Sequence, residues 1–232
     1  METGQVNERF HAEKEMVMET LFVIGAGTMG GGIAQVAALN GFTVYLYDIK
    51  QEFVDKGLKA SSAPGTSSWP GARWPPKTAM RPSPASSARW TCRMPPRPTW
   101  SSRPPWRIWT SSVPFLEAGR IVSPGCILAT NTSSLSVTAV ASAVGSPDKV
   151  VGLHFFNPVP RMALIEIIRG AATSDETYEA AKALSERLGK TAVTVNESPG
   201  FVVNRILIPM INEAAFMLQE GVASAEDIDT AM

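Results

Sequence analysis

The chain has 232 residues, and its 21 lysines and arginines balance its 21 aspartates and glutamates. The length allows a sizeable core, and the balance excludes a global charge that would attract nucleic acid or an anionic membrane. Cys92 and Cys126 form no CxxC pair or metal-ligand cluster, so we expect no metal and a reducing, cytoplasmic setting. No apolar run approaches the roughly 18 residues of a membrane span, and no membrane association is expected.

The N-terminal part of the chain predicts a strand, helix, strand unit behind a disordered tail. Residues 1–19 are polar and charged and lack the apolar core of a signal peptide. A short buried strand is expected at 21–24, a helix at 28–40 and a second strand at 42–47. Another helix is expected from residue 51 to about 58.

A glycine-rich turn joins the first strand to the first helix. Gly25, Gly27 and Gly30 form GxGxxG, with Ala26, Thr28 and Met29 between them. Glycines in this position allow the backbone N–H groups of a helix N-terminus to approach a pyrophosphate. Asp48 follows the second strand, where a carboxylate can accept hydrogen bonds from both ribose hydroxyls and repel a 2′-phosphate. The spacing therefore favours NAD binding; the alternatives are an ordinary glycine-rich turn and a solvated acid at a strand end.

The composition changes abruptly between residues 60 and 115. This segment holds twelve of the eighteen prolines, all six tryptophans, eight basic residues and no acid. Because proline removes backbone donors, we expect no strand or helix of a packed sheet here. The sequence thus predicts an α/β, doubly wound Rossmann-type sheet at 20–198 that is incomplete, being interrupted by an irregular segment at 60–116.

The second half of the chain returns to an ordinary alternation of strands and helices. Strands are expected at 127–130, 149–154, 163–169 and 191–195, and helices at 137–144 and from Ser174, a plausible N-cap, to Gly189. A long helix led by Pro199, with a kink or local break at Pro209, then begins an all-helical domain at 199–232. The last helix stops at Met232 without a C-terminal cap, so the chain looks cut short.

Four polar residues are candidates for chemistry. His154 ends a predicted strand, where dinucleotide-binding sheets place their ligands, and imidazole titrates nearest neutral pH; it could be a general base or a structural histidine. Glu166 lies between apolar neighbours in a strand and either orients the imidazole or faces solvent. Ser133 and Asn204 can donate to a substrate oxygen, or can be a helix cap and a helix-surface residue.

Five segments together are similar to the NAD-linked 3-hydroxyacyl-CoA dehydrogenases, and most similar to the bacterial members that act on 3-hydroxybutyryl-CoA. The segments are VIGAGTMGGGIAQVAALNGFTVYLYD, ILATNTSSLSVT, VVGLHFFNPVPRMALIEIIRG, ESPGFVVNRILIPMINEA and SAEDIDTAM. The resemblance covers about residues 20–59 and 117–232. It implies NAD as cofactor, a short-chain acyl-CoA substrate and a homodimer.

The resemblance also implies a role for each of the four polar residues. His154 would be the base, Glu166 would orient it, and Ser133 and Asn204 would hold the 3-oxygen of the substrate. The implied reaction is the reversible oxidation of 3-hydroxybutyryl-CoA to acetoacetyl-CoA, with a hydride passing to NAD.

The segment from 60 to 116 departs from the family pattern. We hypothesise two compensating frameshifts near codons 59 and 116, because the segment has the composition of a GC-rich gene read out of frame. The alternative is a genuine basic, Pro/Trp-rich insert on a non-catalytic Rossmann remnant or adaptor that binds a protein or nucleic-acid partner. If the chain is made as written, we expect exposed apolar helix faces around Val202, Leu207 and Phe216, poor solubility and little turnover.

Overall fold

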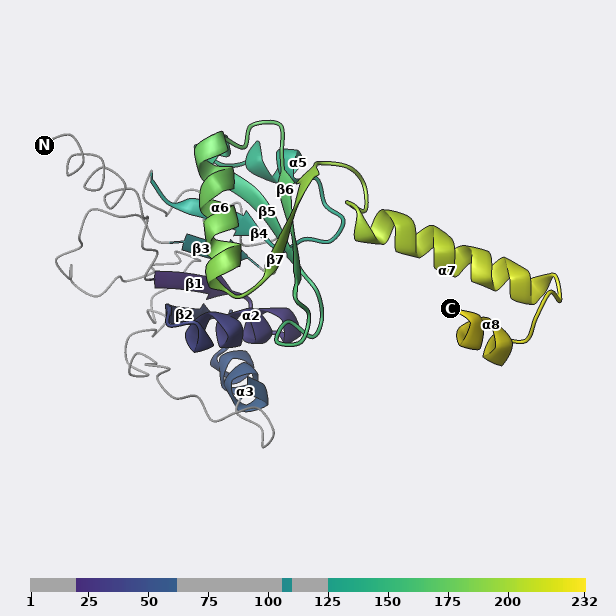
Figure 1. Cartoon of the computed structure of the whole chain (residues 1–232). Coiled ribbons are helices and arrows are strands. Elements are labelled where there is room, and N and C mark those ends of the chain that lie inside the picture. The colour runs from purple at the N-terminus through teal and green to yellow at the C-terminus, as the bar shows by residue number, and fades with distance from the viewer. Residues whose placement is uncertain (1–19, 62–105, 110–124) are drawn as a thin grey trace, which may run out of the picture.

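The computed structural model describes residues 20–61, 106–109 and 125–232 (Figure 1). The strands are β1 (Thr20–Ile24), β2 (Thr43–Tyr47), β3 (Trp106–Trp109), β4 (Ile127–Thr130), β5 (Val150–Phe155), β6 (Leu164–Arg169) and β7 (Thr191–Asn196). The helices are α2 (Thr28–Leu39), α3 (Gln51–Ser61), α5 (Val137–Ala141), α6 (Asp175–Arg187), α7 (Val203–Gln219) and α8 (Ala225–Ala231), with a 3-10 turn at Pro147–Lys149. The expected tail at 1–19 and most of the segment at 60–116 lie outside the described residues.

Within the described residues the strands form one sheet in the order β2-β1-β3-β4-β5-β6-β7. The first five strands in this order are mutually parallel, β6 is antiparallel to β5, and β7 is parallel to β6. The chain reverses its direction of travel across the sheet after β2, so a crevice opens beyond the carboxyl end of β1. The doubly wound α/β fold predicted from the sequence is confirmed.

Strand β3 corrects one expectation. The segment 60–115 was expected to contribute no strand and to leave the sheet incomplete, yet Trp106–Trp109 pairs with β1 on one side and β4 on the other. This run, WRIW, contains no proline, and tryptophan and isoleucine favour extended backbone. Two parallel strands that flank a gap also present unpaired backbone groups, which an inserted strand satisfies. The proline content of the whole segment therefore did not exclude four suitable residues within it.

Two apolar clusters lie on opposite faces of the sheet. On one face, β1, β2, β5 and β6 pack against α2 and α6. On the other face, β4, β5 and β6 pack against α5 and Phe201. Successive side chains of a strand point to opposite faces, so Leu153 and Ile167 enter the first cluster while Val150 and Ile168 enter the second. His154 and Glu166 consequently share the α5 face.

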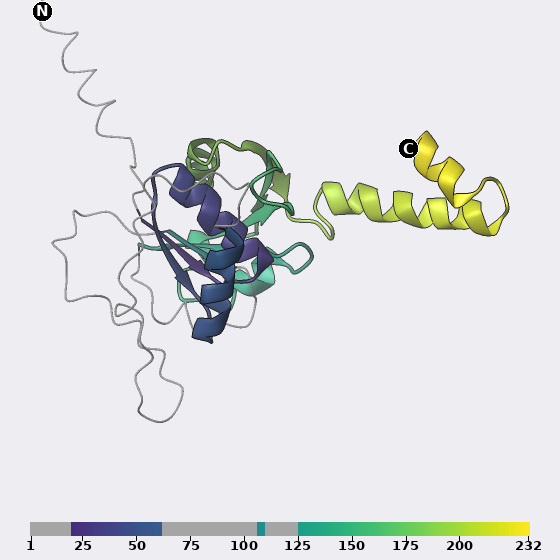
Figure 2. The ribbon, with the colours of Figure 1, turned by 90° about the horizontal axis from the view of Figure 1, so that it is seen from below.

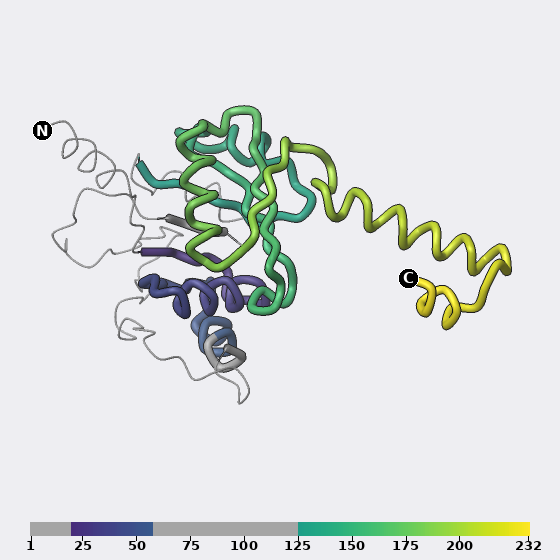
Figure 3. The backbone as a smooth tube through the Cα atoms, in the orientation of Figure 1, coloured from purple at the N-terminus to yellow at the C-terminus, as the bar shows by residue number. Residues whose placement is uncertain are grey.

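The connection between β5 and β6 packs closely on α2. Figure 3 shows this connection reaching across to the helix, and a Cβ at Gly32 would lie 3.0 Å from the Cβ of Val159. Lys190 fixes the same connection, because its Nζ donates hydrogen bonds to the backbone oxygens of Val159 and Met162 at 2.6 and 2.7 Å. Its partial burial lowers the pKa of the Lys190 ammonium. The loop is thus held between a glycine of α2 and a lysine that precedes β7.

Helix α7 extends away from the sheet, and α8 folds back beside the far end of α7 (Figures 1 and 2). The helix continues through Pro209 without ending there, so of the kink or local break expected at this proline, the break is not seen. None of its residues is buried, and the exposed fractions of Val202, Leu207 and Phe216 are 43, 37 and 47%. The expectation of exposed apolar helix faces around these three residues is confirmed.

Close packing around Gly152 in β5 gives a test of the core. A Cβ on this glycine would lie 2.8 Å from the Cβ of Ile168 and 3.0 Å from Cγ2 of Val137. We expect Gly152→Ala to lower the free energy of unfolding by about 1–3 kcal/mol, the usual cost of overpacking. The matched control is Gly145→Ala, because a Cβ there meets no atom within 4 Å. Urea denaturation of both variants measures the difference; equal stabilities would contradict the packing.

Candidate active site

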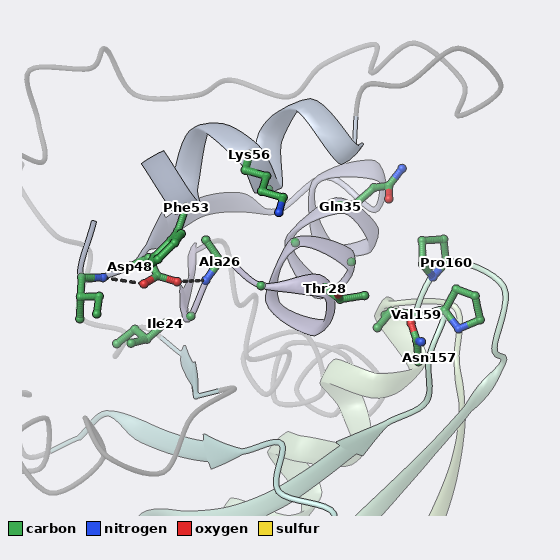
Figure 4. Close-up of a pocket in the computed structure, with 17 residues that line it drawn as sticks. Ile24, Ala26, Thr28, Gln35, Asp48, Phe53, Lys56, Asn157, Val159 and Pro160 are labelled. Atoms are coloured by element: carbon green, nitrogen blue, oxygen red, sulfur yellow. Dashed lines mark hydrogen bonds between the residues drawn. The ribbon is translucent and has the colours of Figure 1, made fainter. Parts of the chain in front are cut away.

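The glycine turn is held by backbone geometry and by one carboxylate. Gly25 has a φ of 103°, which side-chain-bearing residues rarely adopt, and its N–H donates to the oxygen of Tyr47 at 2.8 Å. Asp48 accepts two further backbone hydrogen bonds, from Ala26 to Oδ2 at 2.6 Å and from Ile49 to Oδ1 at 2.7 Å (Figure 4). The carboxylate therefore fixes the turn and lies beside it, at the end of β2 as predicted from the sequence.

An open cavity of about 710 Å³ lies in front of this turn. Asp48 and Thr28 line it from one side, and Asn157, Val159 and Pro160 of the β5–β6 connection line it from the other (Figure 4). A Cβ placed on Gly27 would meet no atom within 4 Å, so the backbone at the start of α2 is open to the cavity.

The residues of this cavity fit a dinucleotide. No side chain caps the N-terminus of α2, so its first N–H groups and the positive end of its dipole are available to a pyrophosphate. The Asp48 carboxylate has acceptor sites beyond the two backbone bonds that it makes, which suits ribose hydroxyls. Of the residues predicted to bind the cofactor, Gly25, Gly27, Thr28 and Asp48 line the cavity.

The two remaining predicted cofactor residues lie elsewhere. Gly30 is buried inside α2, and Met29 lines a second cavity. The glycines that follow, Gly31 and Gly32, line the cofactor cavity in addition to those predicted. The run of three glycines at 30–32 was the available sequence signal for this close approach.

His154 and Glu166 are directly opposite each other in the antiparallel β5–β6 pair. The distance from Nδ1 of His154 to Oε2 of Glu166 is 2.7 Å. His154 is 6% exposed and Glu166 is fully buried. Of the two interpretations left open for Glu166, the structure supports the partner of the imidazole and not the solvent-facing acid. An ionised carboxylate can only accept, so Nδ1 is the donor in this bond, and in the neutral imidazole the lone pair is then on Nε2.

The second oxygen of Glu166 binds the start of α7. Oε1 accepts hydrogen bonds from the N–H groups of Val202 and Val203 at 2.9 and 3.0 Å. Phe201, with a φ of 55°, brings the chain into this position and places its ring 5.6 Å from the imidazole ring of His154. The buried carboxylate thereby has three donors, which offsets the cost of removing its charge from water.

A second cavity, of about 540 Å³, brings together three of the four polar candidates. His154, Ser133 and Asn204 all line it, although they come from β5, the β4–α5 loop and α7. The side-chain Nδ2 of Asn204 lies 3.5 Å from the backbone oxygen of Ser133. Asn157 lines both this cavity and the cofactor cavity, so the two spaces meet at the end of β5. Glu166 lies behind His154.

Sequence reasoning missed two asparagines at this junction. Asn131 is buried, and its Oδ1 accepts a hydrogen bond from the N–H of Phe155 at 2.8 Å, which ties the β4–α5 loop to β5. Asn157 follows the end of β5 and separates the cavities. The usable signal was their position, because polar residues that follow the carboxyl ends of parallel strands line the ligand crevice of such sheets.

Glu197, the residue after β7, binds the start of α5. Both of its carboxylate oxygens lie 3.2 Å from the N–H of Thr138, and the Thr138 hydroxyl donates to Oε2. Partial burial alone raises the pKa of Glu197, but hydrogen bonds from the hydroxyls of Thr138 and Ser136 and from the backbone of Thr138 and Val137 more than offset this, so its pKa lies below the ordinary value.

These features define a dinucleotide-binding α/β fold with a histidine–carboxylate pair beside the cofactor cavity. The sequence profile of the 3-hydroxyacyl-CoA dehydrogenase NAD-binding domain matches residues 20–68 and 113–198, and that of the family's C-terminal domain matches 200–232. The residues between 68 and 113, most of the unusual segment, are not matched.

Known proteins of this family resemble the chain over most of its length. It is 43% identical to a probable 3-hydroxybutyryl-CoA dehydrogenase of Deinococcus radiodurans, over 90% of this chain and 76% of the relative. It is 35% identical to the human mitochondrial hydroxyacyl-coenzyme A dehydrogenase, over 94% of this chain and 72% of the relative. The crystal structure of (S)-3-hydroxybutyryl-CoA dehydrogenase from Ralstonia eutropha superimposes with a TM-score of 0.71 at 36% identity, covering 90% of this chain and 75% of that one.

The chain therefore belongs to the 3-hydroxyacyl-CoA dehydrogenase family. It is by family an oxidoreductase, and its cofactor is NAD. These comparisons do not favour the alternative of a non-catalytic remnant or adaptor. No helix in the described parts of the chain is both long and apolar enough to cross a membrane, and residues 20–61, 106–109 and 125–232 contain no cluster of metal-ligating side chains.

The lowered pKa of Glu197 predicts a specific loss of stability in acid. An acid whose pKa is lower in the folded than in the unfolded chain stabilises the fold above its unfolded value, 4.5, and this contribution disappears as the pH falls through the folded pKa. We expect Glu197→Gln to lower the urea midpoint at pH 6, and we expect the difference from the wild type to shrink as the pH is lowered below 4.5. A constant difference between the two midpoints across this range would contradict the assignment.

Proposed function

We propose that the chain interconverts 3-hydroxybutyryl-CoA and acetoacetyl-CoA, with His154 as the general base. The observation that carries this proposal is the buried His154–Glu166 pair at the wall of a cavity that adjoins the cofactor cavity. The named relatives act on this class of substrate. When bound, NAD supplies the hydride acceptor.

Residues of the chain transfer the proton and orient the substrate. His154 accepts the proton of the 3-hydroxyl at Nε2, because Glu166 holds Nδ1 in its protonated form. The imidazolium that results faces a carboxylate already in position, so its charge is stabilised without reorganisation. Ser133 and Asn204, on the same cavity, donate hydrogen bonds to the 3-oxygen and orient it toward the base. In the reverse direction the imidazolium returns the proton.

Cofactor selection is assigned to Asp48. Its carboxylate accepts hydrogen bonds from the ribose hydroxyls of NAD, and its negative charge repels the 2′-phosphate of NADP. The family's homodimer is also proposed for this chain. The reduced turnover and solubility expected from the unusual segment stay predictions, as does the frameshift hypothesis, because residues 62–105 and 110–124 lie outside the described residues.

Removing the charge of Asp48 tests the cofactor assignment. We expect Asp48→Asn to weaken NADH binding about tenfold, as loss of a charged hydrogen-bond acceptor does, and to reduce the preference for NADH over NADPH. The control is Asp55→Asn, on the neighbouring helix and bonded to Gln51 at 3.1 Å. Fluorescence titration with both nucleotides gives the affinities; an unchanged preference would remove Asp48 from cofactor selection.

Replacing the base tests the chemistry. We expect His154→Gln to lower kcat for acetoacetyl-CoA reduction by a factor of about 100 to 10,000, the usual contribution of a general acid or base, while NADH affinity is retained. Glu166→Gln should lower kcat less, and Glu186→Gln, an exposed acid on α6, should leave it unchanged. NADH absorbance follows the reaction, and the wild-type rate in the same assay tests the expected impairment. A His154→Gln variant with wild-type turnover would refute the proposal.

A further inference from the structure

The two residues assigned to the substrate oxygen lie on a loop and in the first turn of a helix that follows a linker. Ser133 lies in the loop 131–136 between β4 and α5, and Asn204 follows the linker 197–202 between β7 and α7. A hydrogen bond to a substrate oxygen needs its two donors at a fixed separation. The direct contact between the two loops is weak, because Nδ2 of Asn204 is 3.5 Å from the Ser133 oxygen. Their separation must therefore be set elsewhere.

The loop and the linker are each tied at one end by a hydrogen bond already described. The first loop is tied at its start by Asn131, whose Oδ1 accepts the N–H of Phe155 at 2.8 Å. The linker is tied at its far end by Glu166, which accepts the N–H groups of Val202 and Val203. These contacts leave the end of the first loop and the beginning of the linker to be held. One side chain joins these two ends.

That side chain is Glu197. It is the first residue of the linker, and its own N–H donates to the oxygen of Arg169 at 3.2 Å, which continues the β6–β7 pairing. Its carboxylate accepts from the N–H and the hydroxyl of Thr138. The Ser136 hydroxyl and the Val137 N–H also help to lower the pKa of this carboxyl. Since Thr138 lies in the first turn of α5, directly after the first loop, the carboxylate clamps the end of that loop to the linker.

The remaining partner of the cluster connects it to the sheet. The Thr138 hydroxyl accepts the N–H of Ala171 at 2.8 Å while it donates to Glu197, so both of its functions are used. A Cβ on Gly170 would lie 3.2 Å from the N and Oγ1 of Thr138, so the start of α5 packs closely against the glycine that follows β6. The Thr138 side chain thus joins the Glu197 carboxylate to the backbone beyond β6.

We propose that Glu197 is a positioning residue that sets the separation of Ser133 and Asn204 across the substrate cavity. It contacts neither the cofactor cavity nor the substrate cavity and acts through the two loops. This inference rests on the proposed function, and deepens it by naming what keeps the two oxygen-binding residues in register. Loss of the clamp should weaken acetoacetyl-CoA binding and leave NADH binding intact.

The test compares Glu197→Gln with a matched control in the full chain. Glutamine cannot accept on both terminal atoms, so it loses the bidentate contact with Thr138. We expect acetoacetyl-CoA affinity, measured by calorimetry in the presence of NAD+, with which it cannot react, to fall about tenfold while NADH affinity, measured separately, stays within about twofold. The control is Glu176→Gln, which removes an acid from the first turn of α6 and breaks its 2.9 Å pair with Lys149; neither residue lines either cavity. It should change neither affinity.

A double-mutant cycle separates positioning from general stability. If Glu197 acts through the Ser133 loop, Glu197→Gln should have less than about a twofold effect once Ser133→Ala is present, because coupled residues are not additive. Thr138→Val should reproduce the loss, and Thr138→Ser, which keeps the hydroxyl, should restore binding. Additive effects in the cycle, or a parallel loss of NADH affinity, would reduce Glu197 to a structural role and overturn the inference.

Hydrogen exchange distinguishes failure of this inference from failure of the proposed function. In Glu197→Gln we expect faster exchange of the amides at 132–139, with unchanged exchange at 25–31 in the glycine turn. If Ser133→Ala leaves acetoacetyl-CoA affinity unchanged, the role assigned to Ser133 fails, whatever Glu197 does. If Ser133→Ala weakens binding but exchange at 132–139 is the same with and without the Glu197 carboxylate, the clamp itself is refuted.

Discussion

A single buried carboxylate connects the chemistry of this protein to its architecture. Glu166 is fully buried, and an ionised acid in such a position is strongly destabilising unless its oxygens are bonded. One oxygen bonds the imidazole of His154, and the other bonds two N–H groups at the start of α7. The partners come from two separate segments, β5 and the start of α7, so the carboxylate is satisfied only when both are in place beside β6. Folding and assembly of the base are therefore one event.

The reversal of direction between β5 and β6 makes this arrangement possible. In an antiparallel pair, directly opposed residues place their side chains on the same face within reach of each other. His154 and Glu166 are twelve residues apart in the chain but directly opposed in the pair. The same pairing sends the β5–β6 connection across α2, where Asn157 forms part of the walls of both cavities. One local topology thus supplies both the base pair and the boundary between substrate and cofactor.

Sequence patterns predicted the features that depend on neighbours in the chain. The glycine turn, Asp48 and the strand ends follow from periodicity and turn chemistry, and the four polar candidates required the family resemblance as well. Strand β3 was missed because proline content was averaged over a long segment, whereas pairing requires only four suitable residues between two open edges. The second partner of Glu166 and the clamp at Glu197 could not be predicted, because each joins backbone groups whose approach is decided by tertiary packing.

The same carboxylate also decides where α7 points. The described part of this helix is unburied along its length, and its 17 residues span about 25 Å at 1.5 Å per residue. Its attachment to the sheet is concentrated in its first turn, at Val202 and Val203, so a small rotation there is amplified toward the far end. The apolar side chains of α7 can be covered in one geometry only if that first turn is fixed. Loss of the Glu166 carboxylate would therefore disturb the base and the helix together, because one side chain holds both.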